Sequence, residues 1–234
     1  MNKLYRKSEI WFAVAWIIVY IVGTSIADNL HKAVTLALHL GLTVLAMLWV
    51  YKNDLLRKYG LCKPSLPAKC ALFYIPLIIC VSCNLWFGVQ KNMSVPDTLL
   101  FVGSMLCVGF LEEFIFRGLL FRAMEKDNLK AAVIVTSLTF GFGHIINLFN
   151  GSGMDLLANA GQVVSAVAFG FLFVVMFMKS GSLLICIAAH STINALSAFA
   201  VSPSPIWDLI TALILTVIAA SYALIFWKNP PQKQ

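Results

Sequence analysis

Two adjacent carboxylates, Glu112 and Glu113, lie in the middle of an apolar stretch, and Arg117 follows four residues after Glu113. An ionisable side chain costs about 3 kcal/mol at the centre of a bilayer, so residues of this kind usually belong to a functional site. Neighbouring negative charges also repel each other, which adds to the cost. Residues four apart share one face of a helix, so Arg117 can pair with Glu113. The cluster therefore indicates chemistry in an apolar environment.

Three further polar side chains, His144, His190 and Asn194, lie within later apolar stretches. A carboxylate near a histidine can activate water as a general base. A histidine and an asparagine one helical turn apart can donate hydrogen bonds to a developing oxyanion. These parts suit an amide hydrolase that needs no serine or cysteine nucleophile. The sequence contains neither a Gly-x-Ser-x-Gly nor a His-Glu-x-x-His motif.

The composition indicates that membrane-spanning helices position these residues. Of the 234 residues, 60% are hydrophobic and only 12% are charged, and the mean hydropathy is +0.87. Soluble domains contain about 25% charged residues. We therefore predict an all-α, polytopic membrane helical bundle that forms a single integral membrane domain over residues 1–234. Eight stretches are long and apolar enough to span a bilayer, and they run approximately over Ile10–Ala27, Ala33–Tyr51, Ala71–Val89, Thr98–Phe121, Ala131–Leu148, Ala160–Met178, Leu183–Ala200 and Ile206–Trp227.

The distribution of basic residues predicts the orientation of these spans. Lys and Arg concentrate on the cytoplasmic side of membrane proteins. With the N-terminus in the cytoplasm, 14 of the 17 basic residues fall on that side, and only Lys32 and Lys91 fall outside. We therefore expect both termini in the cytoplasm. The same distribution explains the net charge of +7 without nucleic acid. We interpret the first span as an anchor, because its apolar run is longer than a signal peptide requires.

The predicted spans bring the polar residues to similar depths. An α-helix rises about 1.5 Å per residue, which puts Glu112 and Glu113 about 15 Å from the inner end of the fourth span. By the same rise, His144 lies about 21 Å up the fifth span, and His190 and Asn194 lie about 14 and 20 Å up the seventh. Three helices thus place ionisable or amide groups near the midplane. We expect these residues to form one site.

Each polar residue also has a structural interpretation. A lone histidine in a membrane helix is usually a hydrogen-bonding residue between helices, and we assign His39 in the second span to that role. The Glu113–Arg117 pair alone could be a structural ion pair. Asn194 alone could join two helices by a hydrogen bond. The coincidence of all of these groups at one depth favours a functional site.

Three short motifs in the sequence resemble those of a known family. Residues 112–117 form a Glu-Glu-x-x-x-Arg motif, residues 140–144 a Phe-x-x-x-His motif, and residues 190–194 a His-x-x-x-Asn motif. Their order and spacing resemble the CAAX prenyl protease and bacteriocin-processing family, also called the Abi family, of intramembrane endopeptidases. The resemblance covers about residues 98–200, which would form the protease core.

The resemblance implies roles for the six residues. Glu112 would be the base that activates water, with help from His144. Glu113 and Arg117 would support and polarise the site. His190 and Asn194 would form the oxyanion site, and Asn147 could be a further polar lining residue. The fold would enclose a water-filled cavity that is reached from the cytoplasmic side.

The resemblance leaves the metal dependence open. Two histidines and two glutamates could bind Zn²⁺ in principle, and a metalloendopeptidase-like site would use Glu112, His144 and His190. The same residues also suit a metal-free glutamic intramembrane protease, which we favour. The expected partners are the lipid bilayer and a membrane-bound or lipidated peptide or protein substrate. We expect an integral protein of a bacterial cell membrane.

Two other functions remain open from the sequence. An ion- or proton-coupled transporter could use Glu112, Glu113 and His144 as a relay, although such transporters often show internal repeats that we do not find here. A non-enzymatic bacteriocin immunity or partner protein would instead carry its function in the loops. The glutamate pair would then be dispensable.

Overall fold

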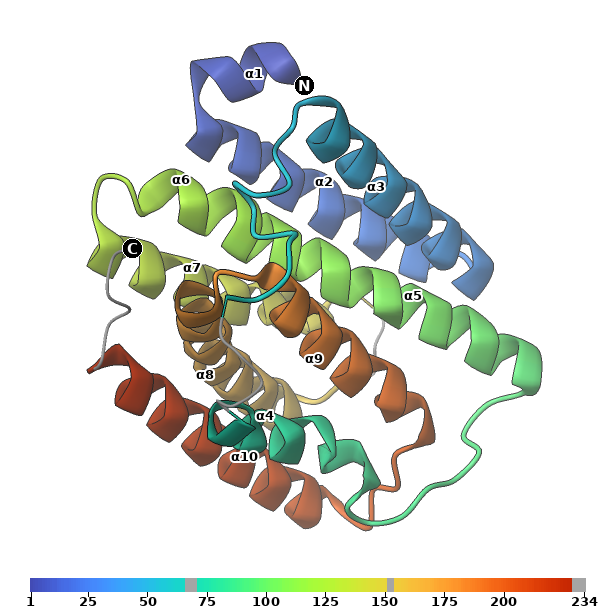
Figure 1. Cartoon of the computed structure of the whole chain (residues 1–234). Helices are drawn as coiled ribbons and strands as arrows, with labels where there is room; N and C mark the ends of the chain where they lie inside the picture. Colours follow the sequence, from blue (N-terminus) through green and yellow to red (C-terminus); the bar gives the residue numbers. More distant parts are fainter. Residues whose placement is uncertain (66–70, 151–153, 229–234) are drawn as a thin grey trace.

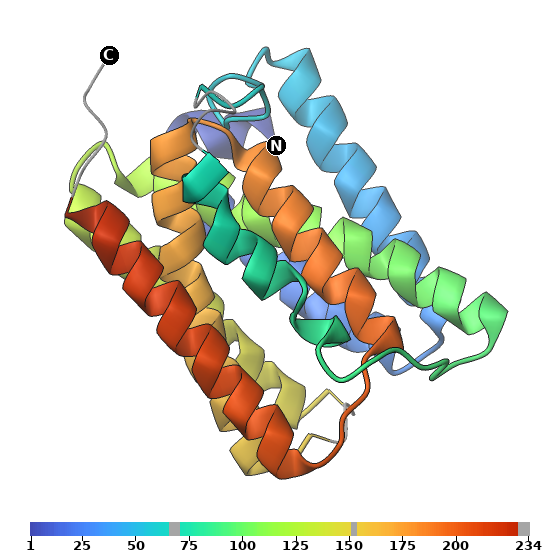
Figure 2. The same cartoon turned by 60° about the horizontal axis from the view of Figure 1, so that its bottom comes forward.

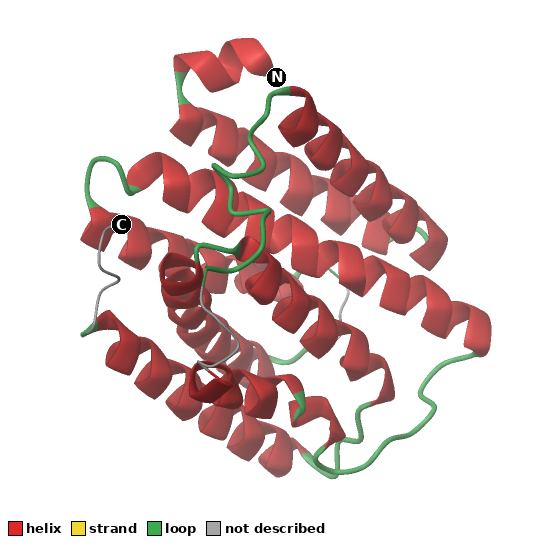
Figure 3. Cartoon of the chain, in the orientation of Figure 1, coloured by secondary structure: helices red, strands yellow, loops and turns green. Residues whose placement is uncertain are grey.

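The computed structural model describes residues 1–65, 71–150 and 154–228. The described residues form helices and connecting loops, and the only strand-like pairing among them is a single bridge between Val89 and Ala200. Figure 3 shows this all-helical architecture, which confirms the predicted all-α class. The helices in chain order are α1 (Asn2–Lys7), α2 (Glu9–Asp28), α3 (Lys32–Lys52), α4 (Ala71–Val81), α5 (Val95–Glu113), α6 (Arg122–Met124), α7 (Leu129–Gly143), α8 (Leu156–Ser180), α9 (Leu183–Leu196) and α10 (Pro205–Trp227).

Four shorter helical segments extend or connect these helices. A π-helical segment, η3, continues α5 over Phe114–Phe121 and leads into α6. The 3₁₀ turns are η2 after α4, η4 after α7 and η5 after α9, with the bounds Cys83–Leu85, His144–Leu148 and Ser197–Phe199.

Six helical stretches of the described chain are long and apolar enough to cross a membrane. They cover Glu9–Asp28, Lys32–Lys52, Val95–Met124, Leu129–Leu148, Leu156–Ser180 and Pro205–Ile225. The protein is therefore an integral membrane protein.

Two of the eight predicted spans differ from this set. The seventh is a shorter apolar helix, Leu183–Phe199. The third is broken, because α4 ends at Val81 after 11 residues and η2 and a loop follow it. Residues 66–70, immediately before α4, lie outside the described chain. The count of eight spans stays a prediction.

The helices run alternately between two ends of the bundle (Figures 1 and 2). We call one of them the basic end; it contains residues 1–9, 52–65, 122–130, 179–182 and 228, which include 12 of the described Lys and Arg residues. The N-terminus and the last turn of α10 both lie there. We call the other the opposite end; it contains residues 28–32, 82–97, 147–150 and 197–205. The two groups of segments correspond to the inner and outer sides that the sequence predicts.

Close helix contacts fix the centre of the bundle. α5 packs between α3 and α9, and α8 packs between α7 and α10. A Cβ atom at Gly109 of α5 would overlap Ser191 of α9, so only glycine permits this approach. The Ser191 hydroxyl donates to the carbonyl of Leu106 at 3.0 Å. Small residues commonly mediate such contacts between membrane helices. This one sets the distance between Glu113 and His190.

The turn from α8 to α9 sets the start of the helix that carries His190. Gly181 adopts the left-handed conformation, with φ of 65°, and ends α8. The hydroxyl of Ser182 then accepts a hydrogen bond from the N–H of Leu184 and caps α9. Serine at this position satisfies one of the free N–H groups of the first turn.

Candidate active site

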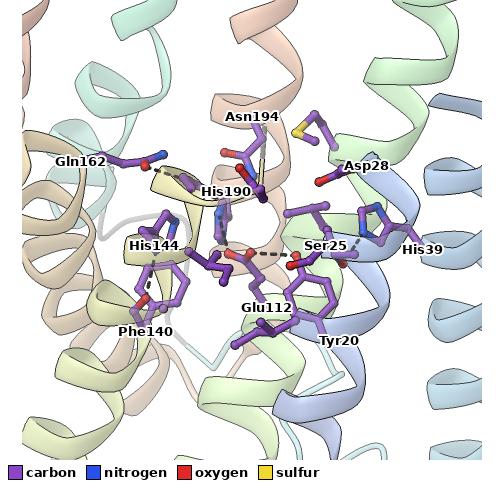
Figure 4. A pocket seen from close by; sticks show the side chains of 18 of the residues that line it. Tyr20, Ser25, Asp28, His39, Glu112, Phe140, His144, Gln162, His190 and Asn194 are labelled. Atoms are coloured by element: carbon purple, nitrogen blue, oxygen red, sulfur yellow. Dashed lines mark hydrogen bonds and ion pairs between the residues drawn. The ribbon is translucent and has the colours of Figure 1, made fainter. Parts of the chain in front are cut away.

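A cavity of about 440 Å³ lies inside the bundle, between α2, α5, α7, η4, α8 and α9. Four of the six predicted site residues line it, namely Glu112, His144, His190 and Asn194. Figure 4 shows them facing the same space, with Glu112 from α5, His144 from η4, and both His190 and Asn194 from α9. Polar groups from three of the predicted spans therefore face one cavity. The other two, Glu113 and Arg117, lie behind the wall and are fully buried.

Glu112 is the carboxylate that faces the cavity, and its side chain is 14% exposed. One oxygen, Oε1, accepts a hydrogen bond from the hydroxyl of Tyr20 at 2.8 Å. The other oxygen, Oε2, lies 3.6 Å from Nε2 of His190. The carboxylate is thus held from two sides, and both contacts leave it on the cavity wall (Figure 4).

His190 connects the two glutamates. Its Nδ1 lies 2.8 Å from Oε1 of Glu113, and its Nε2 faces Glu112. Arg117 Nη1 donates to the same oxygen of Glu113 at 3.1 Å, as the sequence spacing predicts. Arg117 also donates to the carbonyl of Gly170 at 3.4 Å. A chain of contacts therefore runs from the buried arginine through Glu113 and His190 to Glu112.

Aromatic side chains hold the buried charges in place. The guanidinium of Arg117 lies 4.1 Å from the ring centroid of Phe140 and 5.6 Å from that of Phe173. The His190 ring stacks on Phe173 and contacts Phe140 edge to face, with centroids 5.8 Å apart in both pairs. Cation–π contacts are worth about 2 kcal/mol when the cation is desolvated, as Arg117 is here. These rings fix the orientation of the histidine.

His144 reaches the cavity from the first residue of η4. Its Nδ1 lies 3.0 Å from the carbonyl oxygen of Phe140. Because a carbonyl oxygen only accepts hydrogen bonds, Nδ1 carries the hydrogen and Nε2 of the neutral ring keeps a lone pair. The amide of Asn159 donates to the carbonyl of His144 at 2.8 Å, which ties η4 to α8. His144 is thus oriented to accept a proton at Nε2.

The structure also places the other polar residues that the sequence analysis considers. Asn194 lines the cavity one turn beyond His190, and among the described residues nothing hydrogen-bonds to its amide group. Asn147 lines the cavity too, with its Nδ2 donating to Oε1 of Gln162 at 2.8 Å. His39 bonds Thr24 at 2.9 Å and Ser104 at 2.7 Å, as expected of an interhelical hydrogen-bonding residue, although it also borders the cavity.

A comparison with known proteins finds a family that matches the segment of the chain containing these residues. Residues 94–196 match the family described as type II CAAX prenyl endopeptidase Rce1-like. The similarity to that family covers 103 of the 234 residues. The match confirms the resemblance that the three motifs indicate, and all six predicted site residues fall inside it. No curated protein matches the chain.

Tyr20 is the contact to Glu112 that the sequence does not reveal. It comes from α2, outside the segment that matches the Rce1-like family. Its side chain is buried and its hydroxyl reaches Glu112 across 92 positions in the sequence. A tyrosine in an apolar span resembles any core aromatic residue, so sequence alone gives no signal for this role. The first predicted span therefore contributes directly to the cavity of the Rce1-like segment.

The helix that carries the Glu-Glu-x-x-x-Arg motif is not a regular α-helix. It changes to π-helical geometry at Phe114, directly after the two glutamates, and every residue from there to Phe121 is buried. Such segments are rare and are frequently found at functional sites. The ion pair between Glu113 and Arg117 spans this change in geometry. Hydrophobic periodicity predicts a helix here but not its local pitch.

The described side chains do not assemble a metal site. No three His, Cys, Asp or Glu side chains among them lie close enough to hold an ion. His190 uses Nδ1 for Glu113, and His144 uses Nδ1 for a backbone carbonyl. These bonds leave Nε2 of both rings available. The zinc set of Glu112, His144 and His190, which the sequence allows, is not gathered among the described side chains, and the preference for a metal-free site stays a prediction.

The cavity leads toward the opposite end of the bundle. Its wall includes Asp28 and Ser197, which are exposed at that end. The sequence predicts access from the cytoplasmic side, where it also places the termini. The geometry does not support that combination, because the N-terminus and the end of α10 lie at the basic end.

Proposed function

We propose that this protein is an intramembrane endopeptidase that cuts a peptide bond of a membrane-associated or lipidated polypeptide. The observation that carries the proposal is the position of Glu112 on the cavity wall, between the Tyr20 hydroxyl and His190. The family match over residues 94–196 supports peptidase chemistry for the same residues. A CAAX-type protease needs water at a site within the membrane, and a polar cavity at this depth provides room for it.

In this mechanism, water attacks the scissile carbonyl while Glu112 removes one of its protons. His144 assists through Nε2, which its bond to Phe140 leaves free to accept a proton. The attack forms the C–O bond and a tetrahedral oxyanion. The proton then moves to the leaving nitrogen, and the C–N bond breaks. General base catalysis of this kind contributes about 10²- to 10⁴-fold to a rate.

Asn194 and His190 are the donors that we assign to the oxyanion. The Asn194 amide lines the cavity, so its N–H groups can reach a substrate oxygen. His190 donates to Glu113 through Nδ1, so it donates from Nε2 to Glu112 or to the oxyanion only as the imidazolium, in which both ring nitrogens carry hydrogen. Stabilisation of a developing oxyanion by one such donor is worth about 3 kcal/mol in other enzymes.

Glu113 and Arg117 act as positioning residues in this proposal. Both are fully buried and neither lines the cavity, so they do not touch a substrate. Arg117 holds Glu113, and Glu113 holds His190 by Nδ1. The expected consequence is that Nε2 always faces Glu112. Tyr20 has the matching role on the other oxygen of Glu112.

The transporter alternative would need a polar path that continues past Glu112. The side chains on the basic side of Glu112 include the buried rings of Trp16, Phe114 and Tyr59. No described observation favours a relay through them. A non-enzymatic partner protein would not need the polar residues of the cavity. Substitution of Glu112 therefore distinguishes this alternative, because its function would survive the change whereas peptidase activity would not.

The test is cleavage of membrane-anchored fluorogenic peptides by the purified protein in liposomes, with and without chelator. Glu112→Gln should lower kcat/KM by at least about 100-fold, because it removes the proposed base. Glu125→Gln changes a carboxylate at the basic end, paired with Arg122 at 2.6 Å, and serves as the matched control. Wild-type cleavage by Glu112→Gln would overturn the proposal. Chelator should leave cleavage by the wild type unchanged.

A further inference from the structure

Most of the cavity wall lies between Glu112 and the opposite end of the bundle. Its wall continues along α2 through Thr24 and Ser25 to Asp28, and along α9 through Asn194 to Ser197. A helix rises about 1.5 Å per residue, so Asp28 lies about 12 Å beyond Tyr20, and Ser197 lies about 10 Å beyond His190. Figure 4 shows Asp28 and Asn194 on the side of Glu112 away from Phe140 and Tyr20. The polar wall therefore reaches the surface at the opposite end of the bundle.

Toward the basic end, the buried rings of Phe116 and Phe140 form the cavity wall, and further buried aromatic side chains pack beyond Phe116. Phe114 packs edge to face on Trp16, with ring centroids 6.2 Å apart, and on Tyr59, with centroids 5.6 Å apart. Tyr59 in turn stacks on Trp49 at 6.1 Å. All four rings are less than 7% exposed. We call Trp16, Trp49, Tyr59 and Phe114 the aromatic layer.

The loop after α3 covers this aromatic layer from outside. The carbonyl of Gly60 accepts a hydrogen bond from the N–H of Leu183 at 2.7 Å, and Ser182 donates to the carbonyl of Cys62 at 2.6 Å. Ser65 donates to the carbonyl of Ser180 through both its N–H and its hydroxyl. The loop is thus fastened to the turn between α8 and α9. Among the described residues, this loop therefore covers the part of the basic end between α3 and the turn from α8 to α9.

The two ends of the bundle also differ in the number of basic residues that they carry. The basic end carries 12 described Lys and Arg residues. At the opposite end, the described chain has only Lys32 and Lys91, together with Asp28, Asp97, Asp155 and Asp208 close to it. An excess of Lys and Arg marks the cytoplasmic side of a membrane protein. The basic end is therefore the cytoplasmic one.

We propose that the cavity of this protein opens to the extracytoplasmic face of the membrane. Its substrates are then polypeptides whose scissile bond is presented at that face, such as exported or membrane-anchored chains, rather than lipidated proteins in the cytosol. The assignment of substrates rests on the proposed function, whereas the direction of the opening does not. This proposal reverses the cytoplasmic access that the sequence predicts and keeps the predicted cytoplasmic termini.

Single cysteines in a background with the six native cysteines replaced by serine test the direction. Ser197→Cys lies at the mouth, Ser25→Cys lies on the wall, and Lys126→Cys lies at the basic end. A small, charged, membrane-impermeant methanethiosulfonate reagent is added to intact cells and to permeabilised cells. Val19→Cys is the matched control, because Val19 lies one position before Tyr20 and is exposed on the outside of the bundle.

We expect Ser197→Cys and Ser25→Cys to react in intact cells, and Lys126→Cys to react only after permeabilisation. Val19→Cys should stay unreacted in both, because lipid surrounds it. The reverse pattern for Ser25 and Lys126 would overturn the proposal, and so would an unreactive Ser25→Cys beside a reactive Ser197→Cys. Each cysteine variant is compared with the wild type for its melting temperature in detergent, so that only folded proteins are scored.

Cleavage separates this proposal from the proposed function. A membrane-anchored peptide presented outside right-side-out vesicles should be cut, and one presented outside inverted vesicles should not. The labelling pattern without any cleavage would leave the outward opening in place and remove the peptidase. Glu112-dependent cleavage in inverted vesicles alone would keep the peptidase and overturn the outward opening.

Discussion

The two ends of the bundle are built from different side chains, although the same helices run through both. On the basic side of Glu112, α2 and the η3 continuation of α5 contribute Trp16 and Phe114 to a dry aromatic layer. On the opposite side, the same two helices contribute Ser25, Asp28 and Glu112 to the cavity wall. These membrane helices are thus divided along their length into a packed half that supplies stability and a polar half that supplies chemistry.

The two adjacent glutamates mark the border between these halves. Glu112 faces the cavity, and Glu113 is buried with Arg117. A buried charge without its partner is strongly unfavourable, whereas a carboxylate on a polar cavity wall is replaceable. Changes on the packed side should therefore act on stability, and changes on the cavity side should act on turnover.

Arg117→Ala should give the largest loss of stability on the packed side. It leaves Glu113 as an uncompensated buried charge, which costs about 3–5 kcal/mol. The measurement is the melting temperature of the purified protein in detergent. Arg122→Ala is the control, because Arg122 pairs with Glu125 at 2.6 Å near the surface. If Arg117→Ala and Arg122→Ala have the same melting temperature, the stability of the packed half does not depend on the buried ion pair. Glu113→Gln added to Arg117→Met should recover part of the loss.

Trp16→Ala should cost about 3 kcal/mol, since it leaves a cavity in the aromatic layer. Trp11 lies on the same helix but is 66% exposed, against 6% for Trp16. Trp11→Ala is therefore the matched control and should melt close to the wild type. Equal melting temperatures for Trp16→Ala and Trp11→Ala would show that the side chains of the aromatic layer are not tightly packed.

Tyr20→Phe should act on the cavity side alone. Removing the hydroxyl takes away one hydrogen bond to Glu112 and is expected to lower kcat about 10-fold, the value of a bond worth about 1.5 kcal/mol to a charged group. KM for an anchored peptide should stay unchanged, since Tyr20 positions the base and does not bind the substrate. A rise in KM at unchanged kcat would assign Tyr20 to substrate binding instead.

Lys58→Met should have the smallest effect, about 1 kcal/mol or less, because the pair that it breaks is near the surface. Lys58 donates to Glu9 at 2.7 Å and to Tyr5 at 2.6 Å. Burial lowers the pKa of Lys58, but these hydrogen bonds outweigh it and raise the pKa above its usual value. Lys58 thus makes its full contribution to the free energy of unfolding at pH values below its pKa in the unfolded chain. That contribution disappears as the pH rises through the pKa of Lys58 in the folded protein. Melting curves at neutral pH and above pH 10 check this, and a gap that widens with pH would contradict it.

The sequence predicts most of the site because charge in an apolar stretch is conspicuous. Glu112, His144, His190 and Asn194 were found from their types and depths, and they line one cavity. Tyr20 was not found, since an aromatic residue in a membrane span is ordinary. The broken third span also escaped prediction, because hydropathy measures the length of an apolar stretch and not its continuity as a helix.

By itself, the sequence determined the membrane class, the helical fold, the family motifs and the asymmetry of basic charge. Each of these depends on residue type and on spacing along one helix, which are local properties. Only the tertiary structure decided which glutamate faces the cavity, that His190 joins the two, and toward which end of the bundle the cavity leads. These depend on contacts such as Gly109 against Ser191 and Trp16 against Phe114, between residues far apart in the chain. The helix rise places residues at a depth, but only packing sets their direction.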